Sequence, residues 1–151
     1  CLMINSTLCY LERGDEYLML HRVKKKNDMN HDKWIGVGGK FEDKESPEEC
    51  VVRETFEETG ITIKNPVKVG YIEFPSKNFY VHVFKSTEFS GAIKENEAEV
   101  DAFWQDANDI PYHEMREADR DFLPDILAGK VVNRRYIYDE NSSKFKSFFT
   151  M

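Results

Sequence analysis

Apolar and β-branched residues gather in short runs along most of the chain, separated by glycine and polar turns. Residues 2–13 and 16–22 are two such runs, and only Gly14 and Asp15 lie between them. Two strand-like runs joined by so short a polar connection predict a β-hairpin. Further strands are predicted at 61–63, 67–74, 79–89 and 101–107, and a closing hairpin at 131–140 and 144–151.

The hydrophobic pattern switches to the helical period in residues 47–59. Ser46 stands at the capping position, Pro47 at the first helical position, and Glu49 follows the serine by three residues. A capping box and an N-terminal proline therefore coincide. Gly60 then ends the predicted helix. The side of the helix expected to pack into the core carries Val51, Val52, Thr55, Phe56 and Thr59.

A second helix is predicted at 118–130, where apolar residues recur at helical spacing and Pro124 interrupts the middle. Residues 108–115 indicate a turn with a short helix, and 23–33 a charged loop. Many strands with few helices favour an α/β or α+β sandwich, in which helices cover a mixed β-sheet of antiparallel and parallel pairs. Because no linker or repeat divides the sequence, we expect residues 1–151 to form one domain.

The composition narrows the classes of function. A formal net charge of -7 argues against a protein that binds duplex nucleic acid through broad phosphate neutralisation. No apolar run approaches the length of a membrane span, about 18 residues. The three cysteines lack paired metal-ligand spacing and fit a reducing cytoplasm. We therefore expect a cytoplasmic protein that binds neither duplex nucleic acid nor a membrane, and the sequence leaves its oligomeric state open.

Three glutamates, Glu54, Glu57 and Glu58, crowd the predicted helix. Helix positions three and four apart are neighbours, with Cβ atoms about 5 to 6 Å apart, so Glu54 faces the other two. At an effective dielectric constant near 20, each pair repels by roughly 3 kcal/mol before screening. Two explanations fit the cluster. It is either a solvated acidic patch relieved by Arg53, or a site for a hard divalent cation such as Mg²⁺, which prefers oxygen ligands.

The glutamates belong to a longer spacing pattern. Gly39, Glu45 and the run from Arg53 to Ile61 follow the order G-x5-E-x7-R-E-U-x-E-E-x-G-U, in which U is apolar. This order resembles the Nudix box, and Thr55 is the one departure, a polar residue at an apolar position on the core side. Outside the box, segments such as LMLHR, KWIGVGGK and YVHVF are similar to those of MutT-type Nudix hydrolases, in the same order. The resemblance spans nearly the whole chain and implies a Nudix-type α/β/α sandwich.

The resemblance also implies an activity and a set of ligands. Nudix hydrolases cleave a nucleoside diphosphate linked to another group, using Mg²⁺ or Mn²⁺ and an attacking water. Glu54 is implied to be either a metal ligand or the base that activates this water, and Arg53 to orient Glu57 or its neighbours. Glu45 either braces the loop or only supplies charge at the helix start. The implied metal ligands are Gly38, through its carbonyl group, Glu54, Glu57 and Glu58.

Relatives in this family often add a carboxylate from a later loop, for which Glu97 and Glu99 are the candidates here. Glu99 is preferred because it precedes Trp104 by five residues, as in those relatives. Arg22, at the end of the second predicted strand, and Lys40, after the glycines, are candidate phosphate-binding residues. Arg22 is the better candidate because arginine can hold a phosphate with two hydrogen bonds.

The candidate base-binding residues follow the relatives less closely. Relatives that recognise oxidised guanine use an Asn or acidic groups, whereas Ile35 stands at the position of that Asn. Asp119 matches one of a pair of aspartates, Ala118 replaces the other, and Arg116 takes the place of a stacking Trp. Aromatic residues that are candidates for stacking on a base are Phe74, Phe79 and Tyr80.

We therefore expect a metal-dependent nucleoside triphosphate pyrophosphohydrolase that acts on small nucleotides. Its expected substrates are oxidised purine deoxynucleotides such as 8-oxo-dGTP, cleaved to the monophosphate and pyrophosphate, which would clean the nucleotide pool. One alternative is a pyrophosphatase for ADP-ribose or another nucleotide sugar. The other is a Nudix-fold module that binds a nucleotide without cleaving it, although such modules usually lack box glutamates and all of them are present here.

Overall fold

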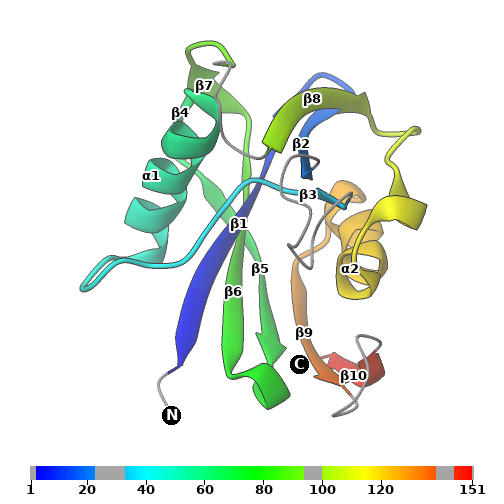
Figure 1. Cartoon of the computed structure of the whole chain (residues 1–151). Helices are drawn as coiled ribbons and strands as arrows, with labels where there is room; N and C mark the ends of the chain where they lie inside the picture. The colour runs from blue at the N-terminus through cyan, green and yellow to red at the C-terminus, as the bar shows by residue number, and fades with distance from the viewer. Residues whose placement is uncertain (1–2, 23–32, 94–99, 139–144, 151) are drawn as a thin grey trace.

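A mixed β-sheet lies between two α-helices in the computed structural model of the chain, with α1 on one side and α2 on the other (Figure 1). The structure describes residues 3–22, 33–93, 100–138 and 145–150. The helices are α1 (Pro47–Thr59) and α2 (Glu117–Leu127), with 3-10 turns η1 (Pro75–Lys77) and η2 (Tyr112–Glu114). The strands are β1 (Ile4–Arg13), β2 (Glu16–Arg22), β3 (Trp34–Ile35), β4 (Thr62–Lys64), β5 (Val67–Phe74), β6 (Phe79–Ser86), β7 (Glu88–Ser90), β8 (Val100–Asp106), β9 (Val132–Tyr138) and β10 (Phe145–Thr150).

The sheet combines parallel and antiparallel pairs. Its strand order is β10-β9-β5-β6-β1-β2-β3, and β8 also pairs with β2. Strand β1 runs parallel to β6 and β5 runs parallel to β9, whereas both predicted hairpins, β1–β2 and β9–β10, are antiparallel. Strands β4 and β7 form a separate antiparallel pair. The predicted α+β class with a mixed sheet is confirmed.

Strand β1 runs through the centre of the core, because its alternate side chains face opposite helices. Tyr10 lies in a buried cluster with Phe122 and Leu123 of α2. Leu11, the next residue along the strand, lies in a second cluster with Val51 of α1. A strand buried on both faces tends to be apolar at successive positions, and this explains the apolar run at 8–11 in β1, which follows the buried polar residues Ser6 and Thr7.

Helix α1 begins and ends where its caps predict. The Ser46 hydroxyl accepts a hydrogen bond from the Glu49 N–H (3.1 Å), and the Glu49 carboxylate accepts one from the Ser46 N–H (2.9 Å). Gly60 adopts the left-handed conformation, with φ 83°, and its N–H donates to the Phe56 carbonyl group (2.8 Å). The helix is therefore fixed at both ends without help from a ligand.

The core-facing side of α1 is narrower than the sequence predicts. Val51, Thr55 and Thr59 are buried and Val52 is partly buried, but Phe56 is 52% exposed. The prediction that Phe56 packs into the core is wrong. The buried stripe follows the positions four apart, 51, 55 and 59, and Phe56 lies about 100° around the helix from Thr55.

Helix α2 begins at Glu117 and ends at Leu127, so it is shorter at its C-terminus than the predicted 118–130. Strand β9 holds it in place. The Arg134 guanidinium donates to the Asp121 carboxylate (3.0 Å) and also pairs with Asp125. The Tyr136 hydroxyl, also from β9, donates to Asp121 (2.6 Å). These contacts fix the helix whose first turn carries residues 116–119.

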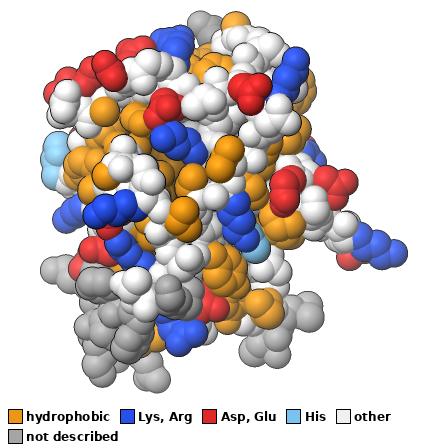
Figure 2. Space-filling view, turned by 180° about the vertical axis from the view of Figure 1, so that it is seen from behind, with side chains coloured by type: hydrophobic (Ala, Val, Ile, Leu, Met, Phe, Trp, Pro, Cys, Tyr) orange, Lys and Arg blue, Asp and Glu red, His pale blue; other side chains and the backbone are white. Residues whose placement is uncertain are grey.

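The surface shows no single dominant feature on the face seen in Figure 2. There, basic and acidic side chains of the described residues are interspersed around hydrophobic ones. Within the described ranges, neither helix has the length and apolar character that crossing a membrane would require.

Candidate active site

The glycine-containing loop before α1 is bound to the edge of β1. The Thr7 N–H donates to the Gly39 carbonyl group (2.9 Å), and Cys9 and Val37 exchange two backbone hydrogen bonds (2.6 and 3.1 Å). A Cβ on Gly38 would lie 2.0 Å from the Thr7 carbonyl oxygen. Only glycine permits so close an approach of two backbones, and for this reason the loop can lie flat against the strand.

The same loop touches the carboxylate side of α1. A Cβ on Gly39 would lie 2.4 Å from the Glu54 carboxylate, and the Gly38 N–H donates to the Glu58 carboxylate (3.3 Å). Two glycines therefore bring the loop backbone within reach of two of the predicted metal ligands. The backbone of residues 38 and 39 therefore lies beside the side chains of Glu54 and Glu58.

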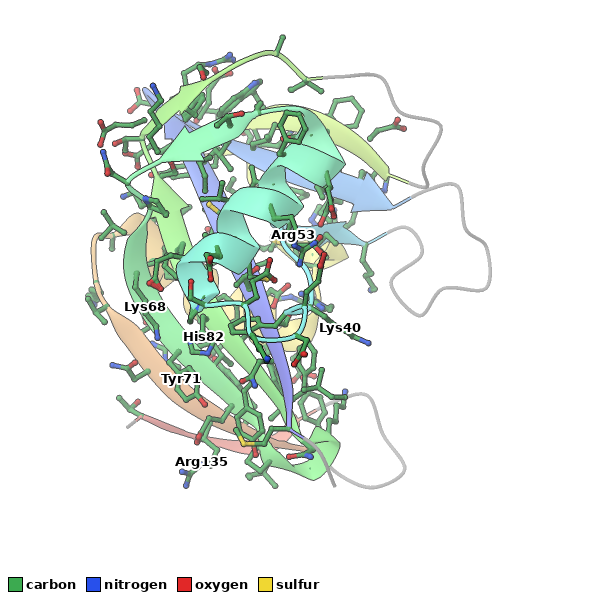
Figure 3. The ribbon with its side chains drawn as sticks, turned by 90° about the vertical axis from the view of Figure 1, so that its left-hand side faces the viewer. Lys40, Arg53, Lys68, Tyr71, His82 and Arg135 are labelled. Carbon is green, nitrogen blue, oxygen red and sulfur yellow. The ribbon has the colours of Figure 1, made fainter. Side chains whose placement is uncertain are left out.

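Arg53, labelled in Figure 3, forms ion pairs with Glu42, Glu45, Glu54 and Glu57. Its Nε and Nη2 atoms donate to both oxygens of Glu45 (2.7 and 2.9 Å). Its Nη1 atom donates to Glu54 (2.9 Å) and to Glu57 (3.0 Å), and Nη2 also donates to the Lys40 carbonyl group (3.1 Å). The predicted orienting role of Arg53 thus has a set of direct contacts, with Glu45 as the strongest partner.

These contacts shift the pKa values of the pair in opposite directions. Hydrogen bonds from Arg53 lower the pKa of Glu45 from its ordinary 4.5 to about 2. The hydrogen bond to Glu45 raises the pKa of Arg53, with Glu54 adding to the effect. Glu45 and Arg53 are therefore both charged at neutral pH. Glu45 also accepts a hydrogen bond from the Glu42 N–H (2.9 Å). Its carboxylate therefore holds both the loop backbone and the Arg53 side chain.

The donor set suits a hard divalent cation. Glu54 is 17% exposed and Glu57 is 55% exposed, so one carboxylate is held inside the site and the other faces outward. Carboxylate and carbonyl oxygens are the ligands that Mg²⁺ accepts. Among the described residues, however, no three Asp, Glu, His or Cys side chains already stand in a metal-binding arrangement. Arg53 takes one oxygen from each of the two carboxylates, Oε1 of Glu54 and Oε2 of Glu57.

A cavity of about 540 Å³ opens beside the glycine loop. Its walls are mainly apolar and include Leu8, Ile72, Phe74, Phe79, Val81, Phe122 and Tyr138. Ile35, Lys40 and Asp119, three of the four predicted substrate-binding residues, line it together. Gly38 and Gly39 line it as well, so the cavity adjoins the carboxylates of α1.

The structure does not describe the side chains of the other predicted phosphate and metal ligands. Arg22 is the last residue of β2, and its backbone pairs with Val100 of β8, but its side chain lies outside the described part of the structure. Glu97 and Glu99 also lie outside the described residues. Their predicted roles in binding phosphate and metal therefore stay predictions.

An ion pair lies in the wall of the cavity. The Nε and Nη2 atoms of Arg116 both donate to Oδ2 of Asp119 (3.0 and 2.8 Å). The Asp119 side chain is only 4% exposed, whereas that of Arg116 is 39% exposed. Burial opposes the charged form of Arg116, but the carboxylate of Asp119 outweighs it and raises the pKa of the guanidinium. The guanidinium of Arg116 therefore stays charged in the cavity wall.

A second cation stands nearby. The Lys77 ammonium group lies over the ring of Tyr138, 4.1 Å from its centroid. Burial and the charge of Arg116 lower the pKa of Lys77. The sequence gives Lys77 no binding role, and it places Arg116 only where relatives carry a stacking Trp. Lys77 lies in η1, a turn that the sequence pattern does not predict, and nothing local marks it as part of a cavity.

The three aromatic residues predicted as candidates for stacking on a base do not all face the cavity. Phe74 and Phe79 line the cavity, with ring centroids 6.1 Å apart. Tyr80 is not among the lining residues, and its ring stacks on Tyr71 of β5 (6.5 Å). Successive residues of a strand point to opposite faces of the sheet, so Phe79 and Tyr80 cannot both face the cavity.

Comparison with known proteins adds a family match and named relatives. Residues 4–126 match the family model described as the NUDIX domain. An oxidized purine nucleoside triphosphate hydrolase from Danio rerio is 32% identical over 110 residues, covering 70% of each chain. An uncharacterised Nudix hydrolase from Bacillus subtilis is 30% identical over 131 residues, covering 82% of this chain and 79% of the relative.

Solved structures give the same result for the fold. The chain resembles the crystal structure of a MutT protein from Bacillus halodurans, with a TM-score of 0.81, 25% identity and 97% of each chain covered. It also resembles an ADP-ribose pyrophosphatase from Streptococcus suis, with a TM-score of 0.64 and 19% identity, covering 85% of this chain and 92% of the other. At that identity, the second likeness concerns the fold alone.

Proposed function

The chain belongs to the Nudix family of hydrolases, which cleave phosphoric anhydride bonds in small nucleotides with the help of divalent metal ions, and from this premise we propose a narrower activity. The protein hydrolyses purine nucleoside triphosphates, oxidised ones such as 8-oxo-dGTP among them, to the monophosphate and pyrophosphate. The metal ion is Mg²⁺ or Mn²⁺. The free thiols Cys9 and Cys50 are consistent with work in the reducing cytoplasm.

One observation carries this proposal: Gly39 belongs both to the cavity wall and to the contact surface of Glu54. A nucleotide with its base among Phe74, Phe79 and Phe122 would therefore extend its phosphates toward the carboxylates of α1. The cavity volume suits a base and sugar, and its mostly apolar walls with a few polar groups are typical of small-molecule sites.

The residues would share the work as follows. Gly38, Glu54, Glu57 and Glu58 would hold the metal, which would offset charge on the phosphates and lower the pKa of the attacking water. Arg53 keeps the helix carboxylates in position through its contacts with Glu54 and Glu57. Lys40 and Arg22 would bind phosphate oxygens, Glu99 would add a further carboxylate, and Glu54 remains either a ligand or the base. Asp119 and Ile35 would contact the base from the cavity wall.

A panel of nucleotides separates the proposal from its alternatives. With Mg²⁺ present, we expect 8-oxo-dGTP and dGTP to release pyrophosphate rather than inorganic phosphate. Release of AMP from ADP-ribose, without turnover of either triphosphate, would favour the nucleotide-sugar alternative. Tight nucleotide binding with no product from any member of the panel would favour the non-catalytic module.

The metal assignment has a test of its own in Glu57→Gln. This change removes one negative charge from a ligand that is 55% exposed, so we expect kcat to fall by about 100-fold or more while the fold is retained. Calorimetric titration with Mg²⁺ should show weaker binding as well. Glu48→Gln, on the exposed first turn of the same helix, is the matched control. Equal turnover in the wild type and Glu57→Gln would contradict the assignment.

A further inference from the structure

The loop before α1 turns its backbone groups alternately toward β1 and toward α1. Residues 37, 39 and 41 form backbone hydrogen bonds with the strand, at Cys9, Thr7 and Asn5 respectively. In a strand pairing of this kind, the backbone groups of the intervening residues point the other way. The Gly38 N–H indeed donates to Glu58 of α1, and the Lys40 carbonyl group accepts from the same helix. This alternation places the Gly38 carbonyl group, a proposed metal ligand, on the side of α1.

The neighbouring carbonyl group, that of Gly39, is held by two side chains from different elements. It accepts hydrogen bonds from the Thr7 N–H (2.9 Å), the Thr7 hydroxyl group (3.3 Å) and the Cys50 thiol group (3.5 Å). The hydroxyl oxygen and the thiol sulfur also lie 3.4 Å apart, within hydrogen-bonding distance of each other. Both side chains are buried, Thr7 in β1 and Cys50 in α1. The strand and the helix therefore meet at this one oxygen.

Two proton arrangements satisfy the contacts among Thr7, Cys50 and Gly39. Either the thiol donates to Gly39 and the hydroxyl donates to the sulfur, or the hydroxyl donates to Gly39 and the thiol donates to the hydroxyl. Burial raises the pKa of the Cys50 thiol to about 11, so the thiol keeps the proton that both arrangements need. Each side chain thus supports the other as well as the carbonyl group.

The Gly39 peptide borders both kinds of proposed metal ligand. It follows Gly38 directly, and a Cβ on Gly39 would lie 2.4 Å from the Glu54 carboxylate. Cys50 lies one helical turn before Glu54, and the Nη2 atom of Arg53 is 3.9 Å from its sulfur. A shift of the Gly39 carbonyl group would therefore move the Gly38 carbonyl group relative to the carboxylates of α1.

We propose that Thr7, together with Cys50, is a positioning residue that fixes the Gly38 carbonyl group where it can share a divalent ion with the carboxylates of α1. The proposal rests on the proposed function, because it takes these groups to be the metal ligands. Thr7 acts through the Gly39 peptide and is not a ligand itself. Groups that orient metal ligands in this way commonly change metal affinity by about 10- to 100-fold.

Binding of Mn²⁺ to the nucleotide-free protein tests this role without turnover. The electron paramagnetic resonance signal of free Mn²⁺ falls as the ion binds, so it gives the Kd directly. We expect the Kd to rise about tenfold in Thr7→Val, which keeps the shape of the side chain and removes its hydroxyl group. Thr7→Ser keeps the hydroxyl group and should bind Mn²⁺ within about twofold of the wild type. Equal Kd values for the wild type and Thr7→Val would overturn the proposal.

Thr55→Val is the matched control, because it makes the same chemical change at another fully buried threonine. The Thr55 hydroxyl group has no hydrogen-bond partner among the described residues. Its removal should therefore leave the Kd for Mn²⁺ unchanged. A rise in Kd as large as that of Thr7→Val would show that any altered buried threonine weakens the site, and the positioning role would be lost.

A spectroscopic measurement identifies the group that moves and separates a positioning role from a loss of stability. Glycine labelled with carbon-13 at its carbonyl group should couple to bound Mn²⁺ in an electron–nuclear double resonance spectrum of the wild type. We expect this coupling to weaken in folded Thr7→Val and in Cys50→Ala, and to return in Thr7→Ser. No coupling in the wild type, or the same coupling in Thr7→Val, would contradict the proposal.

Nucleotide assays on the same variants distinguish this proposal from the proposed function. Weaker Mn²⁺ binding in Thr7→Val, without hydrolysis of any triphosphate by the wild type, would refute the proposed activity and leave the positioning role standing. Equal Mn²⁺ binding by the wild type and Thr7→Val, with pyrophosphate released from dGTP by both, would do the reverse. A wild type that binds no Mn²⁺ would refute the metal assignment and the positioning role together.

Discussion

Glu45 is held on both oxygens by one guanidinium, and this makes it part of the protein's stability as well as of its candidate site. The side chain is 11% exposed, so solvent competes little for these hydrogen bonds. Arg53 in turn reaches Glu54 and Glu57 with its third nitrogen. A single residue thus links the loop before α1 to two of the proposed metal ligands.

This pairing predicts a pH dependence with a definite sign. The pKa of Glu45 is about 2 in the folded protein and near 4.5 in the unfolded chain, so the unfolded chain takes up the proton first as the pH falls. The stability that Glu45 contributes is complete above about pH 4.5 and is lost as the pH falls toward 2. Urea unfolding of the wild type and Glu45→Gln should give a difference in unfolding free energy that narrows between pH 5 and pH 2.5.

The control for this measurement is Glu48→Gln, which changes an exposed carboxylate of the first turn of α1. Its unfolding free energy should follow the wild-type curve. Parallel curves for the wild type and Glu45→Gln across the whole acid range would show that the ion pair does not stabilise the fold.

At the scale of elements, α1 could be predicted almost completely from the sequence. Its start, its end and the position of its carboxylates depend on residues within one helix and the loop before it. Glu45 and Arg53 are eight residues apart in the sequence, so a local spacing pattern is long enough to include both partners of this contact. Phe56 was misplaced because the width of a buried stripe depends on what packs against the helix, and the spacing pattern does not contain that information.

Thr55, the departure from the box, lies in the buried stripe of α1. It is fully buried, and its hydroxyl has no hydrogen-bond partner among the described residues. Thr55→Val keeps the shape and removes the unsatisfied oxygen, so we expect the free energy of unfolding to rise by about 1 kcal/mol. Denaturant unfolding measures this change in stability. We expect the catalytic activity of Thr55→Val to equal that of the wild type.

The matched control is Thr62→Val on β4, where the side chain is exposed and the change should stay within about 0.5 kcal/mol. A lower stability for Thr55→Val than for the wild type would mean that the buried hydroxyl has a partner after all.

At the scale of the whole molecule, the cavity could be predicted only in part. Its lining runs from Ser6 to Tyr138 and depends on the parallel pairing of β1 with β6 and of β5 with β9. No local pattern encodes which distant strands meet, so the resemblance supplied Ile35, Lys40 and Asp119, whereas Lys77 came only from the structure. The fold class was predictable because helix and strand periods are local properties, but the strand order was not.

Gly39 joins the two halves of the candidate site, and Gly39→Ala should therefore disturb both. The added Cβ would lie 2.4 Å from a carboxylate that Arg53 holds in place, so Glu54 must move. We expect kcat/KM for dGTP to fall by about 10- to 100-fold, the range typical when groups supporting a metal ligand are altered. Steady-state kinetics with Mg²⁺ measures it.

Gly14→Ala serves as the glycine control, because a Cβ there meets nothing within 4 Å and only the positive φ of 60° is strained. It should lower stability modestly and leave kcat/KM unchanged. If Gly39→Ala behaves like Gly14→Ala, the contact between the loop and Glu54 has no part in the reaction.

The guanidinium at the centre of the glutamates has one more consequence. Because Arg53 already offsets the mutual repulsion of Glu45, Glu54 and Glu57, the acidic helix has an internal counterion that is covalently part of the chain. The architecture can then persist through cycles of metal loading and loss. If α1 holds a divalent ion as proposed, Arg53 would allow the helix to keep its shape when the ion leaves, and removal of the ion should then lower activity far more than it lowers the unfolding temperature.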